Sequence, residues 1–266
     1  MADTVLLDVA DGVATLTLNR PAALNALSVE MMQDLAAAVR ALKARDDVAV
    51  VVIAGAGAHF MAGGDLNDFA RHLDLTPRAR LDAFRAIIEH NVNPTVALLQ
   101  SLHQPVIAKV RGACAGFGLS LMLGCDLAVA AEDAVFTTAY SAIALSADGG
   151  MSHFLPRMVG RRKALELLLL AERFPAAEAL RLDLVNRVVP ADALDATVDA
   201  LAAQLQRGPR HAYGELKRLV NASVDASLTE QLGREAEAFA RCSATADFGE
   251  GVEAFLAKRA PAFRGS

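Results

Sequence analysis

The sequence of 266 residues contains no tryptophan, two tyrosines and three cysteines. Cys114, Cys125 and Cys242 form no CxxC pair, and their number is odd. These features argue against a disulfide framework and against a zinc site, so we predict no bound metal and a location in a reducing cytoplasm. The formal net charge of -5 implies no broad basic surface, so we also expect no nucleic-acid partner.

Long apolar runs are missing as well. Stretches such as residues 112–125 are too short and too rich in glycine for a membrane span, so we expect no membrane association. The beginning of the chain, Met1-Ala2-Asp3-Thr4, has no basic segment followed by an apolar one, which predicts no signal peptide. Neither GxGxxG nor GxxxxGK[ST] occurs where a nucleotide-binding turn would need it.

The first part of the chain instead alternates between strand and helix patterns. Apolar residues alternate over residues 5–9, and after a turn the pattern returns over residues 13–18, which predicts two paired strands. Ser28 is suited to cap a helix that runs to about residue 44. The continuous apolar run at 48–54 is typical of a buried strand. Two strands and a helix leading to a third strand predict repeated ββα units.

The remaining chain predicts further helices and strands. Residues 67–103 are predicted to be mainly helical, with Pro77 and Pro94 as interruptions. The runs at 106–110 and 127–131 are predicted strands.

A loop at 136–150 precedes a part of the chain that is almost wholly helical from about residue 161. We therefore expect an α/β core over residues 1–195. A helical region over residues 196–266 would pack on this core or on a neighbouring subunit.

Two glycine-containing segments carry the chemical signal. Phe60-Met61-Ala62-Gly63-Gly64-Asp65-Leu66 follows a buried strand, and its glycines allow a ligand to approach the backbone closely. Taken alone, this segment also fits an ordinary turn that opens a helix, with Asp65 as its cap.

The second segment, residues 110–120, runs from a strand through glycines to the N-terminus of a helix. Such a terminus has unpaired N–H groups and a partial positive charge. Together the two segments can supply the two donors of an oxyanion hole.

In this order and separation the segments resemble those of the crotonase superfamily, which includes enoyl-CoA hydratases and isomerases. Further matches extend the resemblance over nearly the whole chain. They are Leu18-Asn19-Arg20-Pro21 with Asn25-Ala26-Leu27, Gly112-x-x-x-Gly116-x-Gly118 with Cys125-Asp126, Leu155-Pro156-Arg157, and Phe255-Leu256-Ala257-Lys258-Arg259.

The resemblance implies a spiral of ββα units with a helical C-terminal region that assembles homotrimers or hexamers. It implies that the N–H groups of Gly64 and Phe117 hold the thioester carbonyl of an acyl-CoA. CoA is then part of the substrate, and no separate cofactor is expected. The residues implied to contact the substrate or its CoA are Ala26, Ala62, Gly63, Asp65, Leu66, Gly116 and Tyr140.

The reaction of such a thioester also needs an acid or a base. Hydratases of the superfamily use two glutamates, one at the position of Ser120 and the other near Tyr140 here, and neither residue is acidic. A hydroxyl cannot replace a carboxylate as a base near neutral pH. Ala147-Asp148-Gly149-Gly150 resembles a segment of the enoyl-CoA isomerase branch, with the phenylacetate-pathway isomerases as the nearest look-alikes. One carboxylate suffices to move a double bond if it can hold the proton between steps.

We therefore predict an enoyl-CoA isomerase with Asp148 as its acid/base, in an apolar pocket flanked by Met151, Phe154 and Leu155. Asp148 also fits a plain turn residue before two glycines. Two other functions stay open: an aryl-CoA dehalogenase-like hydrolase, and a thioester-binding homologue without turnover. The acyl group itself is not predicted, although residues 67–103 are expected to shape its pocket.

Overall fold

The computed structural model describes residues 3–265, so the prediction made on Met1 and Ala2 lies outside the described residues. The main sheet has the strand order β1-β2-β3-β4-β6-β9, in which β1 is antiparallel to β2 and all other neighbours are parallel. Its strands are β1 (Val5–Ala10), β2 (Val13–Leu18), β3 (Val50–Gly55), β4 (Val106–Val110), β6 (Leu127–Ala131) and β9 (Arg187–Val189).

A second, smaller sheet has the order β5-β7-β8. Its strands are β5 (Ala113–Ala115), β7 (Val135–Thr137) and β8 (Phe174–Pro175). Strand β5 follows β4 along the chain, and β7 follows β6, so the chain passes repeatedly from the main sheet to the small one. This is the spiral of strand pairs and helices that the sequence predicts.

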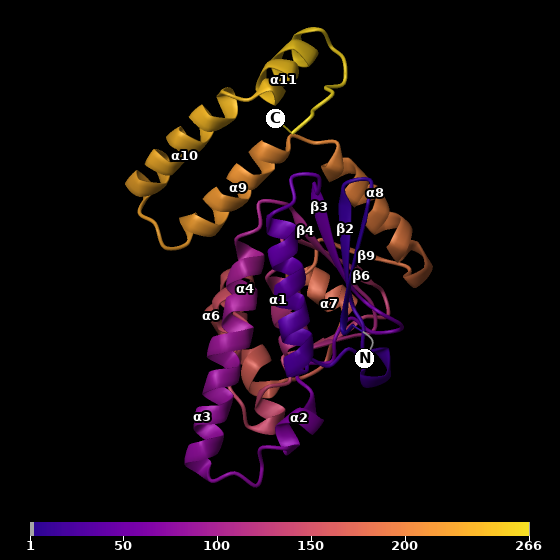
Figure 1. Ribbon diagram of the computed structural model, residues 1–266, viewed down its shortest axis with the longest axis vertical. Helices are drawn as coiled ribbons and strands as arrows, with labels where there is room; N and C mark the ends of the chain where they lie inside the picture. Colours follow the sequence, from indigo (N-terminus) through magenta and orange to yellow (C-terminus); the bar gives the residue numbers. More distant parts are fainter. Residues whose placement is uncertain (1–2, 266) are drawn as a thin grey trace.

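Helices cover both faces of the main sheet (Figure 1). Helix α1 (Val29–Lys43), capped by Ser28 as predicted, packs on one face with α4 (Asn93–Gln100), while α8 (Leu194–Gln206) packs on the other. Alternate residues of β3 belong to the two cores that result. Because both faces are buried, the whole strand is apolar, which explains the continuous run in its sequence.

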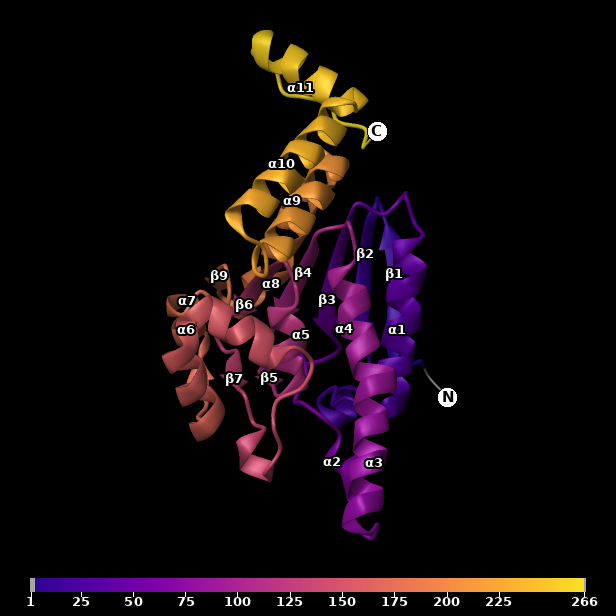
Figure 2. The same ribbon diagram turned by 90° about the vertical axis from the view of Figure 1, so that its left-hand side faces the viewer.

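The remaining helical elements connect these layers. They are η1 (Pro21–Ala23), α2 (Leu66–Ala70), α3 (Pro77–Ile87), the π-helical turn η2 (Ile88–Val92), α5 (Phe117–Leu123), η3 (Ser141–Ile143), α6 (Met151–Leu170), α7 (Ala176–Arg181) and η4 (Ala191–Ala193). The predicted interruption at Pro94 is wrong, because α3, η2 and α4 follow one another directly as a single long helix (Figure 2). The π turn pairs the Asn93 N–H with the Ile88 carbonyl, so Pro94 lies where the hydrogen-bond register changes and its missing N–H is tolerated.

Helix α6 begins at Met151, ten residues before the predicted start of the helical part. It contains Pro156 and a kink at Gly160, where φ is 76°. These two residues interrupt the helical pattern, which is why the sequence placed its beginning too late.

The C-terminal helices extend beyond the core (Figure 1). They are α9 (Arg210–Ser223), α10 (Leu228–Ser243) and α11 (Ala246–Leu256). The expected boundary after residue 195 falls inside α8, which packs on the sheet, so this protruding part begins with α9. Lys217 of α9 joins it to the core, since its ammonium lies 2.7 Å from the Asp126 carboxylate and donates to the Gln104 carbonyl.

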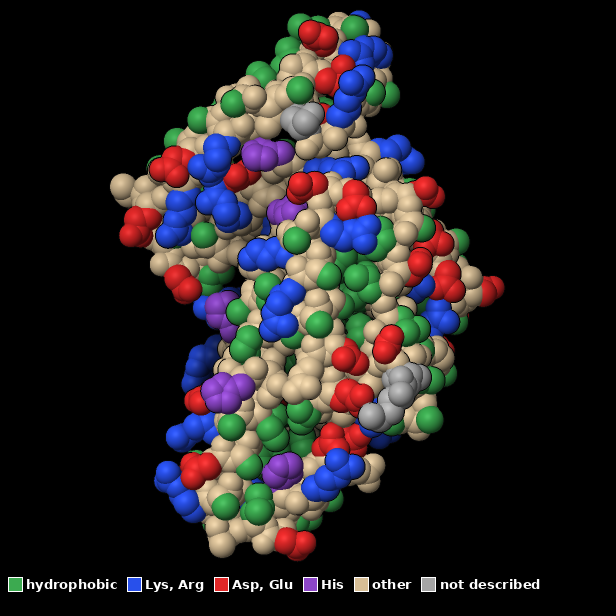
Figure 3. Space-filling view, in the orientation of Figure 1, with side chains coloured by type: hydrophobic (Ala, Val, Ile, Leu, Met, Phe, Trp, Pro, Cys, Tyr) green, Lys and Arg blue, Asp and Glu red, His purple; other side chains and the backbone are tan. Residues whose placement is uncertain are grey.

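The surface carries charges of both signs. On the face shown in Figure 3, Lys and Arg side chains are interspersed with Asp and Glu side chains over the core and the C-terminal helices. Among residues 3–265, no helix combines the length and the apolar character that crossing a membrane requires.

Candidate active site

The two glycine-containing segments lie side by side. Met61 and Cys114 form a parallel bridge, in which the Met61 N–H donates to the Ala113 carbonyl (3.0 Å) and the Ala115 N–H donates to the Met61 carbonyl (2.9 Å). A second bridge joins Leu27 to Gly64. The N-terminal signature, the first glycine segment and the second one therefore form one backbone framework.

Close contact between the segments explains two of the glycines. Gly116 has φ of 49°, which favours glycine, and a Cβ there would lie 3.4 Å from the Gly63 Cα. A Cβ at Gly118 would lie 2.5 Å from the Met61 carbonyl oxygen, a distance that would force the two segments apart. Helix α5 can therefore begin directly against the first segment.

Gly64 and Phe117 line a cavity of about 730 Å³. Phe117 is the first residue of α5, so its N–H has no acceptor within the helix. Across the described part of the chain, neither the Gly64 N–H nor the Phe117 N–H donates a hydrogen bond to the protein. Two free donors at one cavity fit an oxygen atom that gains negative charge.

Asp148 lines the same cavity and is held by two hydroxyl groups. The Tyr140 hydroxyl donates to Oδ1 of Asp148 at 2.7 Å. Ser120 Oγ lies 2.8 Å from the Tyr140 hydroxyl and 3.0 Å from the Asp148 carbonyl oxygen. Hydroxyls therefore lie at or near the places where the resemblance puts the glutamates of hydratases. Tyr140 bonds the carboxyl directly, and Ser120 contacts the Tyr140 hydroxyl and the Asp148 backbone.

Burial raises the pKa of Asp148, while the hydrogen bond from Tyr140 opposes the rise. Burial also raises the pKa of Tyr140, and the neighbouring Asp148 charge raises it further, so the phenol stays protonated. A carboxyl with a raised pKa can accept a proton and return it near neutral pH. The arrangement can therefore move a proton on a ligand whose oxygen binds the two N–H groups.

The side chain of Phe117, whose N–H is one of the two donors, contacts the turn that follows Asp148. A Cβ at Gly149 would lie 2.8 Å from this ring, so the ring packs directly against the turn that follows Asp148. Phe117 is buried, with 3% of its surface exposed. The residue that provides one N–H donor thereby also supports the position of the acid/base candidate.

The predicted flanking residues of Asp148 do not line the cavity. Met151 and Leu155 are fully buried in the core, and the Phe154 ring lies against Gly150. Apolar walls come instead from residues of the 67–103 stretch, namely Phe69, Phe84, Ile87 and Ile88.

Most of the residues predicted to contact the substrate meet at this cavity. Those that line it are Ala62, Gly63, Leu66, Gly116 and Tyr140. Ala26 and Asp65 are not among the lining residues. The Asp65 side chain caps α2 by accepting from the Asn67 N–H and pairs with Arg20 at 2.7 Å. Burial alone would raise its pKa, but Arg20 and the backbone bonds hold the pKa below its usual value.

The sequence did not assign roles to Arg20 and Asn25. Arg20 bonds the Ala26 carbonyl as well as Asp65. Asn25, which is wholly buried, accepts from the Arg20 N–H and donates to the carbonyls of Ala56 and His59. These side chains brace the first glycine segment, and their grouping within the N-terminal signature was the available signal.

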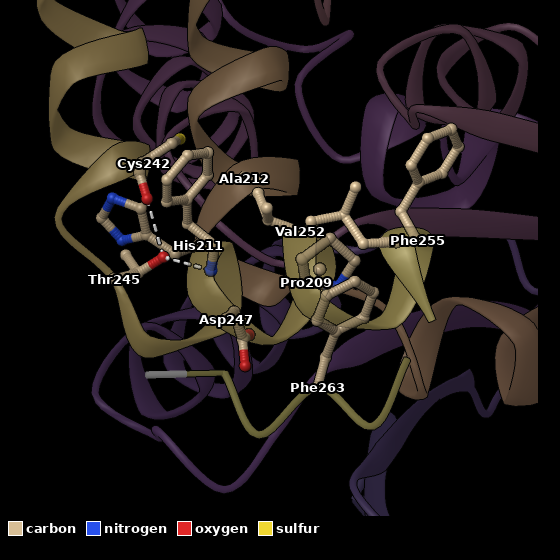
Figure 4. Close-up of a pocket in the computed structure, with 12 residues that line it drawn as sticks. Pro209, His211, Ala212, Cys242, Thr245, Asp247, Val252, Phe255 and Phe263 are labelled. Atoms are coloured by element: carbon tan, nitrogen blue, oxygen red, sulfur yellow. Dashed lines mark hydrogen bonds between the residues drawn. The ribbon is translucent and has the colours of Figure 1, made fainter. Parts of the chain in front are cut away.

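A second cavity, of about 460 Å³, lies among the C-terminal helices (Figure 4). Its walls include Phe248, Phe255 and Phe263. The hydrogen bonds drawn there are local ones, in which the Thr245 hydroxyl donates to the Cys242 carbonyl and accepts from the Phe248 N–H. The Asp247 carboxyl also lines this cavity, and its oxygens accept from the N–H groups of Arg264 and Gly265.

Comparisons with known proteins identify the family and its fold. The sequence profile described as Enoyl-CoA hydratase/isomerase matches residues 8–266. The 1,2-epoxyphenylacetyl-CoA isomerase of Escherichia coli K12 is 37% identical, over 100% of both chains. A Rhodobacter capsulatus protein named "Probable enoyl-CoA hydratase" is 36% identical over 98% of both.

A solved structure is similar over the same extent. It is a protein of Mycobacterium abscessus named as an enoyl-CoA hydratase/isomerase, which superposes with a TM-score of 0.93 at 36% identity. The superposition covers 98% of this chain and 100% of that one.

Proposed function

This chain belongs to the enoyl-CoA hydratase/isomerase family, and from that premise we propose that it shifts a carbon–carbon double bond along the acyl chain of an enoyl-CoA. The observation that carries the proposal is the Asp148 carboxyl, which lines the same cavity as the two free N–H donors. The Tyr140 hydroxyl donates to this carboxyl, and Ser120 Oγ lies within hydrogen-bond distance of that hydroxyl. The name of the Escherichia coli relative, an isomerase of an acyl-CoA, supports the same reaction type.

The reaction follows from the two parts of the site. With a 3-enoyl-CoA bound, Asp148 removes a proton from C2, and the electron pair of the broken C–H bond delocalises into a dienolate. The negative thioester oxygen is held by the N–H groups of Gly64 and Phe117. The carboxylic acid then returns the proton to C4, which leaves the double bond between C2 and C3. Only a proton moves, so the reaction calls for no separate cofactor.

Hydration is the reaction in the name of the Rhodobacter capsulatus relative. It requires a base that activates water at the β-carbon. Burial raises the pKa of the Tyr140 phenol, which therefore cannot act as that base near neutral pH. The hydroxyls at positions 120 and 140 favour isomerisation over hydration.

The decisive experiment compares the wild-type protein with Asp148→Asn on 3-enoyl-CoA, 2-enoyl-CoA and 4-halobenzoyl-CoA. We expect the wild type to convert 3-enoyl- to 2-enoyl-CoA, and the variant to lose about 10²–10⁴-fold in rate, the usual contribution of a general acid/base. Asp133→Asn is the matched control, since Asp133 is exposed and does not line the cavity.

The other outcomes either contradict the assignment of the base or identify a different function. Unchanged isomerisation by Asp148→Asn contradicts the assignment of the base. Rapid hydration of 2-enoyl-CoA, or halide release from the aryl substrate, shows a hydratase or a dehalogenase-like hydrolase. Tight CoA binding without any conversion shows a thioester-binding homologue.

The same proposal includes the assembly and the location of the protein. We infer a homotrimer or hexamer built through the C-terminal helices. Exposed apolar side chains there support it: Leu228, Leu232, Phe239, Phe255 and Leu256. A cytoplasmic location stays a prediction that rests on three free cysteines.

A further inference from the structure

The long helix α3–η2–α4 places three polar side chains on the wall of the cavity that contains Asp148. Arg85, Glu89 and Asn93 line this otherwise largely apolar cavity. The cavity is also lined by residues of the segment 139–150. Among residues 3–265, none of the three side chains makes a hydrogen bond or an ion pair with the protein. All three residues are exposed, so their polar groups are open to water or to a ligand.

The π-helical turn aligns these three residues. Residues four apart in an ideal α-helix are rotated by about 40° from one another, so a row of three would drift around the axis. The wider turn η2, over Ile88–Val92, lies inside this row and offsets part of the drift. Ile87 and Ile88 line the cavity beside the row, so the turn presents an apolar surface and a polar one to the same space.

We propose that this polar row recognises a hydroxyl group on the acyl chain, some atoms beyond the thioester. The inference rests on the proposed binding of an acyl-CoA in this cavity. A hydroxyl is both a donor and an acceptor, and so matches the Glu89 carboxylate as acceptor and the Asn93 amide as donor. A carboxyl group placed between Glu89 and Asn93 would meet repulsion from Glu89, and the cationic Arg85 lies on the other side of Glu89 in the row. A plain hydrocarbon would displace the water around Glu89 without replacing its hydrogen bonds.

The experiment measures binding, so that it does not depend on turnover. Calorimetry compares octanoyl-CoA, omega-hydroxyoctanoyl-CoA and suberyl-CoA, which differ only at the far end, and the same pairs are tested at hexanoyl and decanoyl length. For the wild type we expect a hydroxylated thioester to bind about tenfold to a hundredfold more tightly than its plain counterpart, as for hydrogen bonds to charged groups. Glu89→Leu should abolish that preference, and Glu89→Gln, which keeps an acceptor oxygen, should restore part of it.

Glu132→Leu is the matched control. Glu132 is exposed in the turn between β6 and β7 and does not line the cavity, so the preference should be unchanged. Equal binding of hydroxylated and plain thioesters by the wild type overturns the inference, as does tightest binding of suberyl-CoA. A protein that keeps the Glu89-dependent preference but isomerises no enoyl-CoA refutes the proposed reaction and leaves this inference standing.

Discussion

At the scale of single residues, the main feature of the site is one carboxyl whose surroundings have opposite effects on its pKa. Burial raises the pKa of Asp148, and the hydrogen bond from Tyr140 lowers it. Ser120 in turn contacts the Tyr140 hydroxyl, so three side chains from α5, the segment before η3 and the segment before α6 set one protonation equilibrium. The ionised form of Asp148, which the proposed reaction uses as its base, predominates only above the folded-state pKa.

The variant Tyr140→Phe tests this balance. Without the phenol, the influence that lowers the pKa of Asp148 is lost and burial remains, so the pKa rises further. The ionised base then forms only at higher pH, and we expect the acidic limb of the rate–pH profile to move upward. The profile of kcat/KM for 3-enoyl-CoA measures the shift.

Tyr213→Phe provides the control, because Tyr213 is the other tyrosine of the chain and does not line the cavity. An acidic limb that stays in place in Tyr140→Phe, or moves to lower pH, would show that Tyr140 does not tune Asp148.

At the scale of elements, the important feature is the beginning of α5. The Phe117 N–H is a free donor there because the first residue of a helix has no partner within it. Proline is tolerated at this position and lacks an N–H. We expect Phe117→Pro to lower kcat by about 10²–10³-fold, the usual effect of removing one oxyanion donor.

Phe117→Ala separates the donor from the ring, because alanine keeps the N–H and loses the contact with Gly149. Steady-state kinetics on 3-enoyl-CoA, with circular dichroism to confirm folding, compare the two variants. A rate for Phe117→Pro no lower than that for Phe117→Ala would argue against the backbone donor.

At the scale of the whole molecule, the C-terminal helices present apolar side chains outward. Phe239 on α10 is 76% exposed and Phe255 on α11 is 83% exposed. Burying such rings at an interface is favourable by about 1.5–3 kcal/mol each. We expect sedimentation to show a trimer or hexamer, and Phe239→Glu combined with Phe255→Glu to shift the mass toward the single chain. Leu73→Glu, at an exposed residue far from these helices in the sequence, should leave the mass unchanged.

Much of the fold could be predicted from local patterns. The strands from Val5 to Leu18, the helix after Ser28 and the buried strand β3 agree with the sequence because side-chain period and capping act over a few residues. Where local signals conflict, as at Pro94 and at the beginning of α6, the prediction failed. Packing and a change of hydrogen-bond register decided those places.

The sequence by itself determined the two glycine segments, the choice of Asp148 and the absence of acidic residues at positions 120 and 140. Only the tertiary structure decided what surrounds them: the hydrogen bond from Tyr140 to Asp148, the Phe117 ring against Gly149, and the residues of α3, η2 and α4 that line the cavity. The physical reason is the separation along the chain over which each influence acts. Strand, turn and cap preferences are set by neighbours along the chain, whereas the environment of a carboxyl is set by groups that folding brings to it.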